Sequence, residues 1–246
     1  MQIAGALLFT NLSIHLSLIL KILIKKTAMK KVLYSLFFLT IAINSVSAQG
    51  KNDPDAKKLL DAVTTKFKTY KSVQAKFTLK IENAAGKILG SKSGALYMKG
   101  LKYRVDITGQ QIFCDGTNVS TFDASTKELT VTKVDPAANT ITPQKIFADD
   151  SYDKEFLYKL NDEKVIAGKA IQEVELTPLD KSKPFFKVII DIDKATKTIK
   201  STQIFEKTGE RYTYSVSNMN TTNIIPDATF AFDLKKFPGT EIVDLR

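Results

Sequence analysis

Histidine and cysteine are almost absent from this sequence, which has one of each, His15 and Cys114, and no tryptophan in 246 residues. A single cysteine excludes an internal disulfide. His15 lies in an N-terminal leader, so the chain beyond the leader has no histidine. This excludes Ser-His-Asp and Cys-His catalysis, which need an imidazole base, and the common zinc sites. The glycine patterns that bind nucleotide phosphates are also missing. We therefore expect no metal, no cofactor and no catalysis.

Residues 29–48 have the three regions of a secretory signal peptide. Lys30 and Lys31 precede an apolar stretch over 32–43, and Val46-Ser47-Ala48 supplies the small residues that signal peptidase needs. A membrane anchor is the alternative, but a spanning helix needs about 20 apolar residues, and this stretch is shorter. We predict cleavage after Ala48 and export to the periplasm.

A second apolar stretch, residues 3–24, precedes the signal peptide. It is either a transmembrane helix or translated upstream sequence with the true start at Met29. We favour the second interpretation, because a complete signal peptide rarely follows another apolar segment. The predicted organisation is therefore an N-terminal extension over 1–28, a signal peptide over 29–48 and a single domain over 49–246.

The domain over 49–246 is mildly basic. The leader holds five lysines and no acidic residue, which leaves 31 basic and 26 acidic residues in the domain and a net charge of +5. This excess of positive charge is dispersed along the sequence, so it does not imply a nucleic acid as a partner. It is compatible with binding to anionic lipid surfaces or to acidic partners.

Hydrophobic periodicity predicts a mainly β domain with few helices. Residues 54–70 have helical spacing behind an Asp53-Pro54 start signal, and residues 73–82 then alternate between apolar and polar side chains. Short strands separated by turns follow, and 185–192 reads as a strand buried on both faces. Short helices are predicted at 144–150 and 153–160, and a last strand at 227–232 before an extended tail.

About ten antiparallel strands tend to curl, so helices with spare apolar stripes would lie in or over the concave face. The apolar side chains would then form an ordinary core or a pocket for acyl chains. The strand side chains expected to face this space are Phe77, Leu79, Ile81, Tyr103, Val105 and Ile107. Those expected to close it are Leu59, Val63 and Phe67 from the first helix and Ile146 and Phe147 from the helical insertion.

Carboxylate pairs are the only remaining acid–base candidates. They are Asp149-Asp150, Asp191 with Asp193, and Glu173 with Glu175. A glycosidase needs only two carboxylates, although solvated surface is the ordinary interpretation of such pairs.

The order of the segments resembles the outer-membrane lipoprotein carrier family, which is LolA-like, over residues 54–246. No single motif is specific for the family, but the order of the segments, their spacing and the C-terminal ending together are. The segments that carry the resemblance are Ser72–Thr78 (SVQAKFT), Gly94–Lys99 (GALYMK), Tyr103-Arg104-Val105, the Asp115-Gly116 turn, Thr229–Phe232 (TFAF) and Thr240–Arg246 (TEIVDLR).

The resemblance implies an incomplete antiparallel β-barrel of about 10–11 strands, with an N-terminal helix and a helical lid over a hydrophobic cavity. Members of the family are periplasmic carriers and not enzymes. A monomeric carrier would accept lipoproteins from an ATP-driven extraction complex in the inner membrane and deliver them to an outer-membrane acceptor. The acyl chains of the lipoproteins would be held in the cavity during transport.

One departure from the family affects the lid. Well-studied carriers have an Arg-Pro pair after the lysine that ends the second strand, and that arginine closes the lid. Here Gly100 and Leu101 follow Lys99. The latch is therefore missing, or Arg104 replaces it from the next strand. Two other functions stay open: a lipid- or glycolipid-binding or sensing module of the same fold, and a periplasmic hydrolase with a carboxylate pair.

Overall fold

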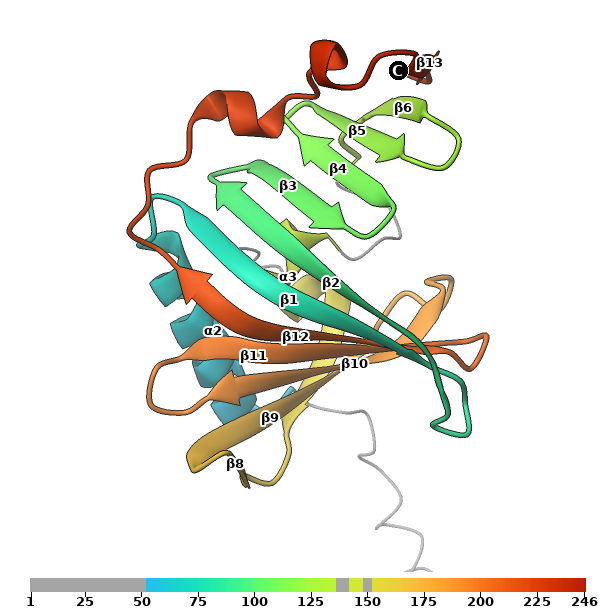
Figure 1. Ribbon diagram of the computed structural model, residues 1–246. Coiled ribbons are helices and arrows are strands. Elements are labelled where there is room, and N and C mark those ends of the chain that lie inside the picture. The colour runs from blue at the N-terminus through green and yellow to red at the C-terminus, as the bar shows by residue number, and fades with distance from the viewer. Residues whose placement is uncertain (1–51, 136–141, 148–151) are drawn as a thin grey trace, which may run out of the picture. The chain divides into compact units, whose positions relative to one another are not determined.

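The computed structural model of the chain describes residues 52–135, 142–147 and 152–246 (Figure 1). The chain divides into two units, Met1–Gly50 and Lys51–Arg246, and the described residues all belong to the second. The signal peptide and the upstream extension lie outside the described residues and stay predictions. Among the described helices, none combines the length and the apolar character needed to cross a membrane.

One sheet of 13 strands forms the framework of the unit, in the order β13-β6-β5-β4-β3-β2-β1-β12-β11-β10-β9-β7, with β8 paired to β9. The edge strands β13 and β7 do not pair with each other, so the curved sheet is an incomplete barrel, as predicted. The strands are β1 (Val73–Glu82), β2 (Ile88–Lys99), β3 (Lys102–Ile107), β4 (Gln110–Cys114), β5 (Asn118–Asp123), β6 (Glu128–Lys133), β7 (Phe156–Leu160), β8 (Lys164–Ile166), β9 (Lys169–Pro178), β10 (Phe185–Asp193), β11 (Thr198–Glu206), β12 (Arg211–Asn220) and β13 (Glu241–Asp244).

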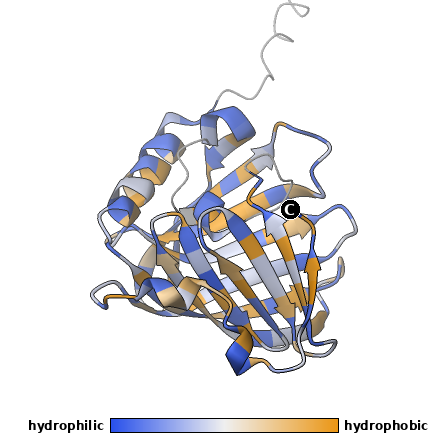
Figure 2. Cartoon of the chain, turned by 90° about the horizontal axis from the view of Figure 1, so that it is seen from above, coloured by the Kyte–Doolittle hydropathy of each residue, from blue (hydrophilic) through white to orange (hydrophobic). Residues whose placement is uncertain are grey.

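Strand β1 joins two halves of the sheet that are far apart in sequence. On one side it pairs with its neighbour β2, and on the other it pairs antiparallel with β12, so that Phe77 faces Gly94 and Val216. Because successive side chains on a strand point to opposite faces, hydrophobic and hydrophilic residues alternate along the strands (Figure 2). This alternation puts Phe77 and Leu79 inside and Thr78 outside.

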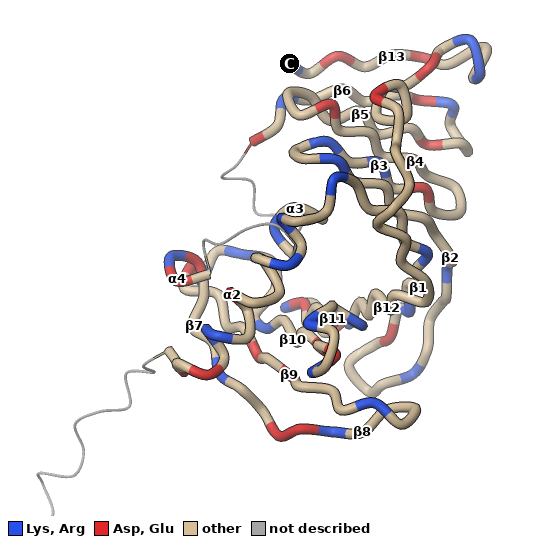
Figure 3. The backbone as a smooth tube through the Cα atoms, turned by 90° about the vertical axis from the view of Figure 1, so that its left-hand side faces the viewer, with Lys and Arg blue, Asp and Glu red and all other residues tan. Residues whose placement is uncertain are grey.

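Helix α2 (Pro54–Lys68) begins where the sequence predicts, because Asp53 caps its N-terminus and Pro54 occupies the first turn. The Asp53 carboxylate accepts the backbone N–H of Asp55 at 2.9 Å. Its buried residues are Ala56, Leu59, Leu60, Val63 and Thr64. The helix packs against β7 and β11, on the concave side of the sheet together with α3 (Pro143–Phe147) (Figure 3).

The interior consists of two hydrophobic clusters. The first lies between α2 and strands β7, β9, β10 and β11, and it includes Leu60, Val174 and Ile190. The second lies over β1 to β4 and includes Phe77 and Met98. Tyr212 and Tyr214 of β12 pack against both clusters, so β12 marks the boundary between them.

Four local predictions are wrong. Residues 156–160 form strand β7 after the short helix α4 (Tyr152–Glu155), because they pair with β9. Residues 227–230 form a 3-10 helix, η2 (Asp227–Phe230), in place of a strand. The segment 185–192 is buried on one face only, since Val188, Ile190 and Ile192 are buried whereas the residues between them are partly exposed. The tail is not simply extended, because it contains the 3-10 helix η3 (Leu234–Lys236) and strand β13. The insertion helix ends its described part at Phe147, and 148–151 lie outside the described residues.

The C-terminal segment covers the outer face of β4 and β5 with aromatic side chains. Phe232 lies between Phe113 and Phe122, with ring centroids 5.5 and 5.2 Å away, and stacks on Phe237 at 4.8 Å. Strand β13 then pairs parallel with β6. This part of the sheet is therefore covered on both faces. Phe113 packs against Phe232 on the outer face, and Val105 packs against the second hydrophobic cluster on the inner face.

Candidate ligand-binding cavity

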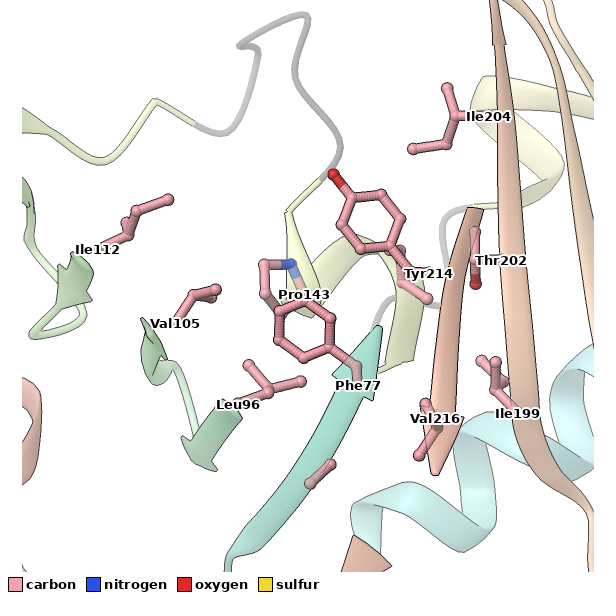
Figure 4. Close-up of a pocket in the computed structure, with 12 residues that line it drawn as sticks. Phe77, Leu96, Val105, Ile112, Pro143, Ile199, Thr202, Ile204, Tyr214 and Val216 are labelled. Atoms are coloured by element: carbon pink, nitrogen blue, oxygen red, sulfur yellow. The ribbon is translucent and has the colours of Figure 1, made fainter. Parts of the chain in front are cut away.

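A cavity of about 170 Å³ lies where the two hydrophobic clusters meet. Its wall comes from strands on both sides of the β1–β12 junction and from α3 (Figure 4). The lining residues are Ala75, Phe77, Leu96, Val105, Ile112, Pro143, Ile146, Ile199, Thr202, Ile204, Tyr214 and Val216.

These side chains face one space because alternate residues of a strand lie on the same face of the sheet. On β1, β2 and β3 the register partners Ala75, Leu96 and Val105 share the inner face with Phe77, and on the other side Val216 and Tyr214 continue that face along β12. Figure 4 shows Phe77, Tyr214 and Pro143 converging from β1, β12 and α3. The cavity is thus a gap between two packed clusters that neither cluster fills.

The cavity is chemically apolar. All of its lining side chains are hydrocarbon or aromatic except Thr202, and Tyr214 adds one phenol. Burial raises the pKa of Tyr214, so this phenol stays neutral. A wall of this kind has no acid or base to offer a reaction, and it disfavours a charged ligand group because an unpaired buried charge is costly. It suits alkyl chains.

Helix α3 closes one side of the cavity. Pro143 and Ile146 point into it, and the side-chain amide of Gln144 donates a hydrogen bond of 3.1 Å to the Leu101 carbonyl in the β2–β3 turn. The Tyr152 hydroxyl donates to the Ile146 carbonyl at 3.3 Å. Ile146 also lines a second, smaller cavity of about 30 Å³ on the other side of α3. Ile146 is therefore shared by the walls of the two spaces.

The structure brings together only part of the predicted lining. Phe77, Val105 and Ile146 line the cavity. Leu79, Ile81, Tyr103 and Ile107 belong to the same hydrophobic cluster as Phe77 without lining the cavity.

The α2 residues of the prediction lie outside the cavity wall. Val63 and Phe67 line a cleft of about 10 Å³ beside Ile199, and Leu59 packs in the cluster under α2. Phe147 ends α3, and its side chain lies outside the described residues.

Sequence reasoning missed the wall contributed by β11 and β12. Ile204, Tyr214 and Val216 come from strands that were predicted but were not assigned a face. Their alternation along 211–216 carried a usable signal. The pairing of β12 with β1, which the sequence does not reveal, directs the side chains of Tyr214 and Val216 into the cavity.

Arg104 lies on the opposite face of β3 from Val105. Its Nε donates to Asp106 at 2.7 Å, and its guanidinium lies over the Phe113 ring, 4.8 Å from the centroid. These contacts of the described residues belong to the outer face, whereas α3 lies on the inner one. The contact that joins α3 to the β2–β3 turn comes instead from Gln144.

The carboxylate pairs within the described residues do not line the cavity. Glu173 and Asp191 face each other on β9 and β10, and the Lys164 ammonium lies 2.7 and 2.8 Å from their oxygens. Burial acts to raise the pKa of Glu173, but hydrogen bonds from Lys164 and Asn161 outweigh it and lower that pKa. A general acid needs a raised pKa. Glu173 and Asp191 are therefore better suited to a structural ion pair with Lys164 than to catalysis.

Asp193 serves the β10–β11 turn by accepting the backbone N–H of Thr196 at 2.9 Å. The remaining pair, Asp149-Asp150, lies outside the described residues.

Known proteins resemble the chain over most of its length. The family model described as "Outer membrane lipoprotein carrier protein LolA" matches residues 68–233. Two outer-membrane lipoprotein carrier proteins of Pseudomonas putida, from strains GB-1 and KT2440, are each 25% identical over 210 residues, which is 82% of this chain and 94% of theirs. An uncharacterized conserved protein of Thermus thermophilus has a similar fold, with a TM-score of 0.52, 13% identity, and coverage of 77% of this chain and 99% of that one.

Proposed function

The chain belongs to the LolA family of outer membrane lipoprotein carrier proteins, and we propose that it carries lipoproteins by holding their acyl chains in the cavity between β1, β3, β11, β12 and α3. The observation that carries this proposal is the apolar wall. Each methylene that leaves water for such a wall gains about 0.8 kcal/mol. An acyl chain would therefore gain a large free energy without any specific polar contact.

The size of the cavity implies that it enlarges when cargo binds. Its volume of about 170 Å³ is below the roughly 300–1,000 Å³ of typical ligand pockets. Helix α3 is the wall that can yield at least cost, because it is five residues long and Gln144 supplies its side-chain link to the β2–β3 turn. Displacement of Ile146 would also join the main cavity to the space of about 30 Å³ behind it.

The remaining steps of the proposal follow from family membership. After removal of the signal peptide, the carrier would act in the periplasm as a monomer. It would load at an ATP-driven extraction complex in the inner membrane and unload at an outer-membrane acceptor. We propose no catalysis and no cofactor, since the family is named for carriage and the described carboxylate pairs do not line the cavity.

The test places a charge in the cavity and an equal charge on the outer face. Val105→Glu and Phe77→Glu should abolish binding of a fluorescent fatty acid and release of lipoprotein from spheroplasts, because the carboxylate would be buried without a partner. Thr78→Glu, which points outward beside Phe77, is the matched control and should bind and release cargo normally. Circular dichroism checks that each variant folds.

Three results would separate the candidate functions. Folded cavity variants that carry cargo like the wild type would overturn the assignment of the cavity. Fatty acid binding without lipoprotein release would favour a lipid-binding module over a lipoprotein carrier. Turnover in a glycan hydrolysis screen would favour the hydrolase.

A further inference from the structure

Three turns that are distant in sequence meet at one end of the sheet, at the right of Figure 1. Arg211 Nη2 donates to the Ala84 carbonyl at 2.8 Å, which joins the β1–β2 turn to the start of β12. The Lys207 backbone N–H donates to the Pro184 carbonyl at 2.9 Å, and its ammonium donates to the Lys181 carbonyl, which joins the β11–β12 turn to the β9–β10 loop. We call residues 83–89, 179–186 and 206–211 together the rim.

The rim exposes large apolar side chains. Ile88 and Leu89 are 59% and 54% exposed, and Phe186 is 49% exposed. The turn that presents the two aliphatic residues is well defined, because the Asn83 side chain accepts the backbone N–H groups of Ala85 and Lys87 at 3.1 and 2.9 Å. Consecutive strand residues point to opposite sides, so Ile88 and Leu89 project from both faces of the hairpin. Exposed apolar side chains that gather at one place, as these do at one end of the sheet, mark an interaction site more often than apolar side chains scattered singly.

Basic side chains lie among these apolar ones. Lys87, Lys181 and Lys207 are exposed on the three segments of the rim. Arg211 covers the Phe205 ring, 5.5 Å from its centroid, and Phe205 in turn contacts Phe186. The rim also holds three acids, Asp180, Glu206 and Glu210, against four lysines and Arg211, so its net charge is positive. Apolar side chains interleaved with lysines are characteristic of surfaces that lie at a membrane interface.

We propose that the rim binds the surface of a membrane that contains anionic phospholipids. Ile88, Leu89 and Phe186 would enter the headgroup region, and the lysines would pair with lipid phosphates. On the inner face, Ile81 and Tyr212 are register partners located between the rim and the cavity residues Phe77 and Val216. Binding through the rim would therefore bring the rim-side end of β1 and β12, and with it the inner-face residues that lead to the cavity, close to the bilayer. This interaction is independent of what the cavity carries.

Sedimentation with vesicles tests the proposal on the mature protein, residues 49–246, without cargo. Wild type should sediment with vesicles of phosphatidylethanolamine and phosphatidylglycerol, bind phosphatidylcholine vesicles more weakly, and lose affinity as salt rises. The double variant Ile88→Ser/Leu89→Ser should lose about tenfold or more in affinity, because two aliphatic side chains no longer leave water. Val165→Ser/Ile166→Ser, which alters two exposed aliphatic residues of β8, is the matched control and should bind like the wild type.

The outcomes separate this proposal from the function of the cavity. Fatty acid binding in solution should be normal in the rim variant, and vesicle binding should be normal in Val105→Glu. Absence of wild-type sedimentation at low salt, or equal binding by the rim and control variants, would overturn the proposal. Equal vesicle binding with impaired cargo transfer in the rim variant would also overturn it, and would identify the rim as a protein-docking surface.

Discussion

Phe77 and Gly94 face each other across β1 and β2, and the phenyl ring lies directly over the glycine. A Cβ built on Gly94 would stand 2.4 Å from Cζ and 2.8 Å from Cε1 of Phe77, and 2.7 Å from the Asp106 carbonyl oxygen. No real side chain tolerates such distances. Because Gly94 has no side chain, the Phe77 ring can occupy the space beside it. Gly94 therefore helps to set the orientation of Phe77, which lines the cavity.

Gly94→Ala should destabilise the protein and alter the cavity. The added methyl group would push the Phe77 ring inward or separate β2 from β3, and overpacking of this kind costs about 1–3 kcal/mol. Urea unfolding measures the change in stability, and fatty acid binding measures the change in the cavity. Gly90→Ala is the matched control on the same strand, because nothing lies within 4 Å of its added methyl group. Equal behaviour of the two variants would refute the role of Gly94.

Gln144→Ala should loosen α3. The variant loses the hydrogen bond to the Leu101 carbonyl, which contributes about 0.5–1.5 kcal/mol. Hydrogen exchange at 143–147 should become faster, and fatty acid should enter and leave the cavity faster. Gln203→Ala is the control, since it removes an amide hydrogen bond to Thr213 on the outer face of β11 and β12. If both variants exchange cargo at the wild-type rate, Gln144 does not hold the helix.

Asp227 should make the stability of the protein depend on pH in the acid range. Hydrogen bonds from Lys99 and Lys102 lower the pKa of Asp227 from 3.8 to about 2. Since the folded state favours the charged carboxylate, its contribution to stability is fully present above pH 3.8 and is lost as the pH falls through 2.

Asp227→Asn should therefore lower the urea midpoint at pH 7 and have little effect below pH 2, where most of the wild-type carboxyl is also protonated. High salt should reduce the difference at pH 7, because both ion pairs are exposed. A difference that is constant with pH would contradict this assignment.

Cys114 should be inert in the folded protein. The side chain is 2% exposed, and burial raises the pKa of its thiol, so both access and the thiolate fraction are low. An aromatic disulfide reagent at pH 8 should release no chromophore from native protein and one equivalent after unfolding in guanidinium chloride. Reaction of the native protein at the rate of a free cysteine would place the residue at the surface.

Several features of the fold could be predicted because they depend on local patterns. The alternation over 73–82 gave the inner face of β1, and Asp53-Pro54 marked the start of α2 to the residue. The prediction of a large curved sheet with a helix on its concave side is confirmed. A period of two and a capping residue are properties of neighbouring positions, so distant contacts do not alter them.

Other features depended on partners that the sequence does not name. Residues 156–160 form a strand because β9 offers backbone groups to pair with. Phe186 is exposed because the register of β10 with β11 shifts between Phe185 and Lys187, which interrupts the alternation. Gln144 reaches the β2–β3 turn only because the insertion folds back over the sheet. Local propensity carries no information on these encounters.

The sequence by itself determined that the domain has no imidazole, that its strands alternate, and that Phe77 and Val105 point to an apolar interior. Only the tertiary structure decided that β1 pairs with β12, 129 to 146 residues away, and that the two hydrophobic clusters leave a cavity between them. The reason is physical. Side-chain period is fixed by the geometry of one strand, whereas an unfilled volume depends on how every surrounding side chain packs.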